Sequence, residues 1–131
     1  MTESKYYRDG KKTITKVASK GEKMDTCATI HKDYVCCNVK VIKTVSNCPF
    51  DCSYCFLQNF LNNPSLEVIE DETPVIKEIE TKIKVQPWRF FRIGTWELGD
   101  SLALEKETGQ AKRLIDYFAS CPNAILELKT K

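Results

Sequence analysis

The sequence predicts an α/β fold, a parallel sheet whose strands are joined by crossover helices. Runs of β-branched and aromatic residues, which are typical of buried strands, alternate along the chain with segments whose apolar residues recur at helical spacing. Such alternation is typical of parallel sheets, because a crossover helix returns the chain to the edge where the next parallel strand begins.

Three main strands are expected, and each is an apolar run bounded by turn residues. The first covers residues 39–45, where valines and an isoleucine precede Ser46 and Asn47. The second covers residues 88–95 (WRFFRIGT) and the third covers residues 124–129 (AILELK). A shorter extended piece is expected at residues 66–68.

Helices are expected between these strands, at residues 54–61, from about residue 74 to Pro87, and at residues 108–120. The second should begin where Thr73 can serve as the N-cap and Pro74 can take the first helical position. Its apolar residues recur at helical spacing at Ile76, Ile79 and Ile83. The apolar face of the third helix is predicted to contain Ala111, Leu114, Ile115 and Phe118.

The composition is that of one globular domain, because 42% of the 131 residues are hydrophobic and 29% are charged. Residues 1–33 are polar and basic, and we expect a solvated arm or a loosely packed segment that could contact phosphates. Residues 34–131 are expected to fold. No apolar run reaches the roughly 20 residues of a membrane span, and no signal-peptide core follows Met1, so a cytoplasmic location without membrane contact is expected.

Seven cysteines in a chain without a secretion signal indicate metal or redox chemistry rather than a disulfide framework. Three of them, Cys48, Cys52 and Cys55, have C-x3-C-x2-C spacing directly after the first strand. Three thiolates from one loop suit three corners of a [4Fe–4S] cluster, and they leave one iron open to a ligand. In the alternative, a zinc site, Cys52 and Cys55 form one ligand pair, and the other ligands come from Cys27, Cys36, Cys37 or the single histidine, His31.

The cysteines outside the triplet are expected to be small buried residues. These are Cys27, Cys36, Cys37 and Cys121. His31 is expected at the surface or in packing. Four phenylalanines are expected in the core: Phe56, Phe60, Phe90 and Phe91. Glu97 and Asp100 follow the second strand, where ligands of parallel sheets commonly bind, although Asp100 could instead cap a turn.

Three segments together resemble the radical S-adenosylmethionine (SAM) superfamily and, within it, the spore photoproduct lyase-like branch. They are SNCPFDCSYCFLQNFLNNP, RIGTWELGDSLALEKETG and NAILELKTK. The resemblance extends from about Tyr34 to the last residue. It implies that residues 34–131 form the first part of a partial (β/α) barrel, with a cluster loop at residues 48–55.

The resemblance also implies site residues and cofactors. Cys48, Cys52 and Cys55 would ligate the [4Fe–4S] cluster, whose free iron would take the amino and carboxylate groups of SAM. Further cofactor contacts are implied for Tyr54, Gly94, Thr95, Trp96 and Glu97. Reductive cleavage of SAM would give a 5′-deoxyadenosyl radical that acts on an unknown substrate. Family analogy adds nucleic acid as a substrate class and a protein electron donor, and it assigns no catalytic residue.

The sequence departs from the family pattern in two ways. Trp96 stands where the pattern has glycine, so it either obstructs SAM or packs in the core. Lesion-repairing members have a further cysteine near the second strand, and none lies between Cys55 and Cys121, so strict spore photoproduct repair is not expected. The chain stops after the third strand, and we expect this piece alone not to be a competent enzyme. A zinc-stabilised α/β binding module and a truncated remnant without activity are the alternatives.

Overall fold

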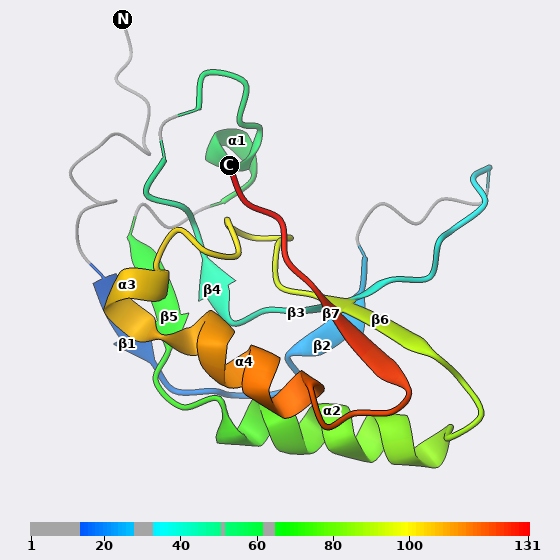
Figure 1. Cartoon of the computed structure of the whole chain (residues 1–131). Coiled ribbons are helices and arrows are strands. Elements are labelled where there is room, and N and C mark those ends of the chain that lie inside the picture. The colour runs from blue at the N-terminus through cyan, green and yellow to red at the C-terminus, as the bar shows by residue number, and fades with distance from the viewer. Residues whose placement is uncertain (1–13, 28–32, 51, 62–64) are drawn as a thin grey trace, which may run out of the picture.

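The computed structural model describes residues 14–27, 33–50, 52–61 and 65–131, and these form two adjoining sheets with the two longer helices on one side (Figure 1). The larger sheet has the strand order β2-β3-β6-β7. Its strands are β2 (Met24–Thr26), β3 (Lys40–Ile42), β6 (Phe91–Gly94) and β7 (Ala124–Glu127). β3, β6 and β7 run parallel, which confirms the predicted parallel sheet, and β2 pairs antiparallel with β3.

The smaller sheet has the order β1-β5-β4, with β1 (Ile14–Val17), β5 (Leu66–Ile69) and β4 (Val45–Ser46). β1 is parallel to β5, and β4 is antiparallel to it. The strand predicted at residues 39–45 is therefore two strands in two sheets. The chain changes partners at Lys43 and Thr44, where the Lys43 N–H donates to the carbonyl of Lys23 and the Thr44 carbonyl accepts from Ile69.

The segment expected to be an arm or loosely packed contains β1 and β2. The structure differs from that expectation because each strand has a partner far along the chain. Ile14 pairs with Leu66 in β5, and Met24 pairs with Ile42 in β3. Met24 is buried in the main core. Lys11 and Lys12, the lysines that best represent the basic arm, lie outside the described residues.

Two helices cover one face of the larger sheet, α2 (Thr73–Val85) and α4 (Gln110–Phe118) (Figure 1). Their apolar side chains form the main core with those of the strands, and the buried helical members are Val75, Ile79, Ile83, Leu114 and Phe118. Thr73 is the first residue of α2 rather than its N-cap, which is Glu72, and the Thr73 N–H is satisfied by the Asp71 carboxylate at 2.9 Å.

The other two predicted helices are shorter or divided. The helix expected at 54–61 is α1 (Leu57–Phe60). The helix expected at 108–120 is α4, preceded by α3 (Glu105–Thr108), and Gly109 with φ of 62° separates the two. Ile115 was expected on the apolar face but is exposed, because the buried face of α4 runs through Ala111, Leu114 and Phe118.

The four phenylalanines expected in the core divide unequally. Phe91 is buried, whereas the other three are mostly exposed: Phe56, Phe60 and Phe90. For Phe56 and Phe60 the reason is that α1 has one turn and lies beside the cysteine loop rather than against a sheet face (Figure 1). In the described ranges, no helix has the length and apolar character needed to cross a membrane.

Candidate functional site

The loop that carries Cys48, Cys52 and Cys55, called the cysteine loop below, begins at the end of β4. It is hydrogen-bonded to the loop that follows β6. The N–H of Asn47 donates to the carbonyl of Leu98 at 2.8 Å. The backbones approach so closely here that a Cβ at Gly99 would lie 2.7 Å from the Asn47 carbonyl oxygen. A side chain at position 99 would therefore push the two loops apart.

Asn47 sets the direction in which the chain enters the loop. Its φ is 76°, a left-handed conformation that asparagine tolerates better than most residues. Its side chain is buried, and Oδ1 accepts the N–H of Cys48 at 2.8 Å. A residue that looked like an ordinary strand terminator in the sequence thus orients the first cysteine of the motif.

A cavity of about 560 Å³ lies between this loop and the carboxyl end of β6. Its size is in the range of about 300–1,000 Å³ that small-molecule sites occupy. The lining residues come from the cysteine loop, from α1, from the end of β6 and from the residue after β2. They are Cys27, Cys52, Tyr54, Cys55, Phe56, Leu57, Phe60, Trp96, Glu97 and Leu98.

Two cysteines of the predicted triplet, Cys52 and Cys55, line this cavity together, and a turn joins them through the Cys55 N–H and the Cys52 carbonyl at 3.0 Å. Cys48 is buried and is not part of the lining. Across the described ranges, no three potential metal-ligand side chains are grouped closely enough to hold an ion. Ligation of a cluster by the three cysteines stays a prediction.

The four residues predicted as cofactor contacts at the end of β6 differ in position, and their contact with a cofactor stays a prediction. Gly94 and Thr95 are buried, and Trp96 and Glu97 line the cavity. Three successive side chains have a buried polar atom without a hydrogen-bond partner in the described part of the chain, namely Thr95 Oγ1, Trp96 Nε1 and Glu97 Oε2. Buried polar atoms are nearly always hydrogen-bonded, so these three atoms are available to bond to a ligand or to water.

Tyr54, also predicted as a cofactor contact, lines the cavity while its ring remains largely exposed. The ammonium of Lys131 lies 4.7 Å from the centre of that ring. Hydrogen bonds with the side chains of Tyr54 and then Cys52 raise the pKa of Lys131 above its ordinary value. The cysteine loop therefore has a positive charge beside it, supplied by a residue from the far end of the sequence.

The segment after β7 is held against the site by Asp100. Its Oδ1 accepts hydrogen bonds from the Leu102 N–H and the Thr130 hydroxyl, and its Oδ2 accepts the N–H of Lys131 at 3.0 Å. The first bond is the turn cap considered from the sequence. The other two bring Lys131 to the cysteine loop, as Figure 1 shows where the C-terminus lies beside α1.

Sequence reasoning missed Lys129, Lys131 and the position of Cys27 at the cavity. The two lysines lie in NAILELKTK, which carried part of the resemblance, so that segment held the available signal. The sequence offered Cys27 only as one of several possible zinc ligands beside Cys52 and Cys55, because its position depends on β2, the strand just before it, which was not expected.

The remaining cysteines differ in their exposure. Cys27 is buried as expected and Cys121 is half-buried. Cys36 and Cys37 are exposed, contrary to expectation, because residues 33–38 form a loop before β3 instead of packing on the sheet. The N–H of Val39 and then Arg92 lower the pKa of the Cys37 thiol below its ordinary value. His31 lies outside the described residues.

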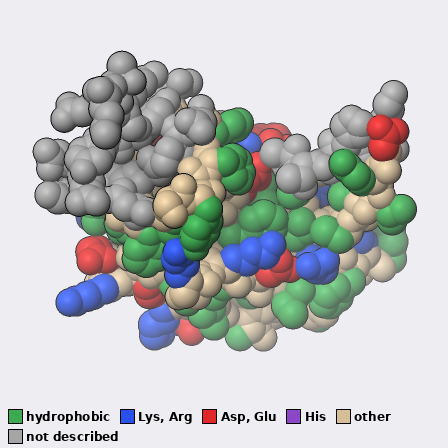
Figure 2. Space-filling view, turned by 90° about the horizontal axis from the view of Figure 1, so that it is seen from above, with side chains coloured by type: hydrophobic (Ala, Val, Ile, Leu, Met, Phe, Trp, Pro, Cys, Tyr) green, Lys and Arg blue, Asp and Glu red, His purple; other side chains and the backbone are tan. Residues whose placement is uncertain are grey.

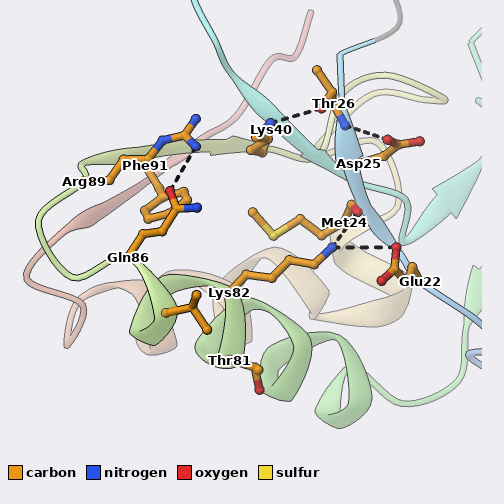
Figure 3. Close-up of a pocket in the computed structure, with 11 residues that line it drawn as sticks. Glu22, Met24, Asp25, Thr26, Lys40, Thr81, Lys82, Gln86, Arg89 and Phe91 are labelled. Carbon is orange, nitrogen blue, oxygen red and sulfur yellow. Dashed lines mark hydrogen bonds and ion pairs between the residues drawn. The ribbon is translucent and has the colours of Figure 1, made fainter.

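A second pocket, of about 380 Å³, lies between the start of β3 and the end of α2 (Figure 3). Lys40, Lys82 and Arg89 contribute positive charge to its lining, and Glu22 and Asp25 contribute negative charge. No cysteine of the motif lines it. Its mixed charges and its distance along the strands from their carboxyl ends make it a weaker candidate than the cavity at the cysteine loop.

No family model matches the chain, and no curated protein does. Solved structures of spore photoproduct lyase do match. One, in complex with dinucleoside spore photoproduct, has a TM-score of 0.78 at 18% identity, over 91% of this chain and 33% of that chain. Another, a double mutant with bound AdoMet and dinucleoside spore photoproduct, has a TM-score of 0.80 at 20% identity, over 96% of this chain and 35% of that chain.

These matches have a definite extent. A single mutant of the same enzyme gives a TM-score of 0.79 at 20% identity and again covers 35% of that chain. The chain thus spans about a third of the length of the solved structures that it matches. At this low identity, the structural match shows the fold alone. The chain therefore has the partial-barrel fold found in spore photoproduct lyase, a radical SAM enzyme.

Proposed function

We propose that the chain holds a [4Fe–4S] cluster on Cys48, Cys52 and Cys55 and binds SAM in the cavity beside it. The observation that carries the proposal is the lining of that cavity. The buried, unpartnered Oε2 of Glu97 shares it with the side chains of Cys52 and Cys55. An isolated buried carboxylate oxygen is costly, and a cationic ligand group such as the SAM amine would satisfy it.

The chain's own residues would bind and orient the cofactors. Glu97 offers an acceptor for an amino group. Lys131 places a positive charge beside Tyr54 and Cys52. The exposed ring of Tyr54 provides a surface for an aromatic base. The bound cluster would supply one electron for the reductive cleavage of SAM to methionine and a 5′-deoxyadenosyl radical.

The substrate class and partners extend this proposal. Three of the matching structures contain dinucleoside spore photoproduct, which supports a nucleic-acid-related substrate for this chain as well. We propose a lyase-like radical reaction in the cytoplasm, with electrons from a donor protein. Because the chain spans about a third of its neighbours, the complete activity would also need surfaces that those longer chains possess.

Anaerobic reconstitution with iron and sulfide tests the cluster and SAM separately. The expected result is an electron paramagnetic resonance signal of a reduced [4Fe–4S] cluster that changes when SAM is added. Replacing Cys48, Cys52 or Cys55 singly by alanine should abolish the signal, whereas Cys121→Ala, at a half-buried cysteine outside the loop, should retain it. A cluster that is indifferent to SAM would remove the SAM half of the proposal.

A zinc site is the second candidate, and one observation favours it: Cys27 lines the same cavity as Cys52 and Cys55. A structural zinc site closes its shell with four ligands, so Cys27 and Cys48 could complete it. The Cys27→Ser variant separates the candidates. If the chain is a zinc-stabilised module, this variant should lose bound metal. If it holds the cluster on three cysteines, the variant should keep its iron.

A further inference from the structure

The side chain of Trp96 is folded back over the end of its own strand. A Cβ built on Gly94 would lie 2.7 Å from Cδ1 of the indole, so the ring occupies the space that glycine leaves open. The indole also packs against a small cluster of buried residues in and beside the neighbouring strands, which consists of Cys27, Val39 and Val41. Trp96 therefore fills the part of the cavity nearest the strand end and packs on the core there, as one of the two readings of it from the sequence expected.

Lys129 contacts the same ring. Its ammonium lies 3.7 Å from the centre of the indole, which is cation–π geometry. The backbone of Lys129 is fixed in turn, because its carbonyl accepts the N–H of Ser101 and its own N–H donates to the Ser101 hydroxyl. The lysine thus contacts the indole from the segment that follows β7, the strand paired with β6.

This position of the indole leaves its polar atom unsatisfied. Trp96 Nε1 is buried and has no hydrogen-bond partner in the described part of the chain. A buried donor without an acceptor is unfavourable, and buried tryptophans normally satisfy this N–H. The packed position therefore has an energetic cost that the side chain could relieve by turning toward an acceptor on a ligand or toward water.

We propose that Trp96 is the gate of the cavity: a ligand reaches the strand end at Gly94 only when the indole leaves it, and Lys129 holds the gate closed. The inference rests on the proposed function in taking SAM as that ligand. The gate sets the affinity, because the apparent dissociation constant is the intrinsic one divided by the open fraction. Trp96 is thus an affinity-determining residue rather than a catalytic one.

Fluorescence reports the gate directly, because the chain has two tryptophans and Trp88→Phe leaves Trp96 as the only one. Trp88 is exposed, so its replacement should leave the fold intact. In the reconstituted Trp88→Phe protein we expect the emission of a buried indole, weakly quenched by acrylamide. Adding SAM should shift the emission maximum to longer wavelength and increase the quenching constant.

Binding measurements on variants give a second, independent readout. Equilibrium dialysis with labelled SAM should show tighter binding to Trp96→Gly and Trp96→Ala, by about tenfold if the closed form predominates by about ten to one. Lys129→Met in the Trp88→Phe background should increase acrylamide quenching without SAM, and Lys129→Arg should restore the low value. Lys84→Met, at an exposed lysine of α2, is the matched control. It should change neither the affinity for SAM nor the acrylamide quenching.

The outcomes separate this inference from the proposed function. SAM that binds the unmodified protein without altering Trp96 emission overturns the gate and leaves SAM binding intact. SAM that binds only after removal of the indole supports the gate in its strongest form. If neither the unmodified protein nor the two Trp96 variants bind SAM while the cluster forms, both the gate and the SAM half of the proposal are wrong.

Discussion

Asn47 combines two properties that few side chains share, a tolerated positive φ and an oxygen placed to accept the next N–H. The sequence placed Asn47 at a strand end but gave no sign of its buried position. Burial arises from two directions, since its N–H donates to the Leu98 carbonyl and its side-chain amide reaches the carbonyl of Ser65 at 3.5 Å. Such a convergence cannot be seen in local sequence, because its members come from separate loops.

Asn47→Ala should therefore lower the free energy of unfolding by about 1–3 kcal/mol, through the lost bond to Cys48 and the strained φ. Asn47→Gly removes the side chain but keeps the backbone conformation accessible, so its loss should be smaller. Urea denaturation of both variants gives the comparison. Equal losses would show that backbone conformation contributes nothing at this position.

The contact between the cysteine loop and the loop after β6 can be tested by a substitution at Gly99. Gly99→Ala places a Cβ 2.7 Å from the Asn47 carbonyl oxygen, so the cysteine loop should move and iron content after reconstitution should fall. Gly21→Ala is a control for backbone strain away from the site, because a Cβ there meets nothing within 4 Å while the φ of 66° disfavours alanine. Iron and sulfide analysis measures the effect, and an unchanged iron content in Gly99→Ala would show that the loop spacing is unimportant.

At the scale of elements, α2 is joined to β2 by one carboxylate. Glu78 accepts the N–H groups of Lys23 and Met24, each at 2.9 Å, and forms an ion pair with Lys82. Burial raises the pKa of Glu78, but the two backbone N–H groups and Lys82 outweigh it, so the net shift is downward. At the start of β2, the N–H groups of Lys23 and Met24 therefore bond to this carboxylate instead of to a neighbouring strand.

The sign of the shift gives a pH dependence. Because the folded-state pKa of Glu78 is lowered, its contribution to stability is complete above the ordinary glutamate pKa of about 4.3. It is lost as the pH falls through the lowered folded value. Glu78→Gln should cost about 2 kcal/mol at pH 7 and little at pH 3. Thermal unfolding between these pH values checks this, and a pH-independent difference would contradict it.

Elements with strong local patterns were predictable, and those set by distant partners were not. Periodic isoleucines with Pro74 at the start located α2 within one residue. β1 and β2 have little pattern of their own and exist because β5 and β3 accept them. Phe56 and Phe60 satisfied helical spacing, yet spacing cannot tell whether a helix turn faces a core or a cavity rim.

For the whole molecule, the main feature is the face of the larger sheet opposite α2 and α4. α2 and α4 occupy one side, and Figure 2 views the other, where hydrophobic side chains lie among basic and acidic ones. Arg92 and Ile125 are paired in register on this face, and both are exposed. Arg92 forms an ion pair with Glu127, which places charge on the face. β7, which contains Ile125 and Glu127, is the edge strand of this sheet in the described part of the chain.

An exposed edge with an apolar residue favours association between chains. Ile125 is 51% exposed on β7, and Ile115 is 47% exposed on α4. We expect concentration-dependent association of the chain, which Ile125→Lys should reduce and Ile115→Lys should not. Sedimentation velocity over a range of concentrations measures it. A monomer at every concentration, or equal effects of the two variants, would contradict the role assigned to the edge.

Lys131 and Asp100 add a consequence for the order of events during synthesis. The thiols of the cysteine loop emerge from the ribosome well before Lys131, which later lies beside Cys52 and Tyr54. Domains form as their chains are completed, from the N-terminal side onward. In the proposed cluster protein, iron can therefore reach the cysteine loop during a limited period of synthesis. This period begins when Cys55 has been made and ends when Asp100 binds the N–H of Lys131 beside the loop.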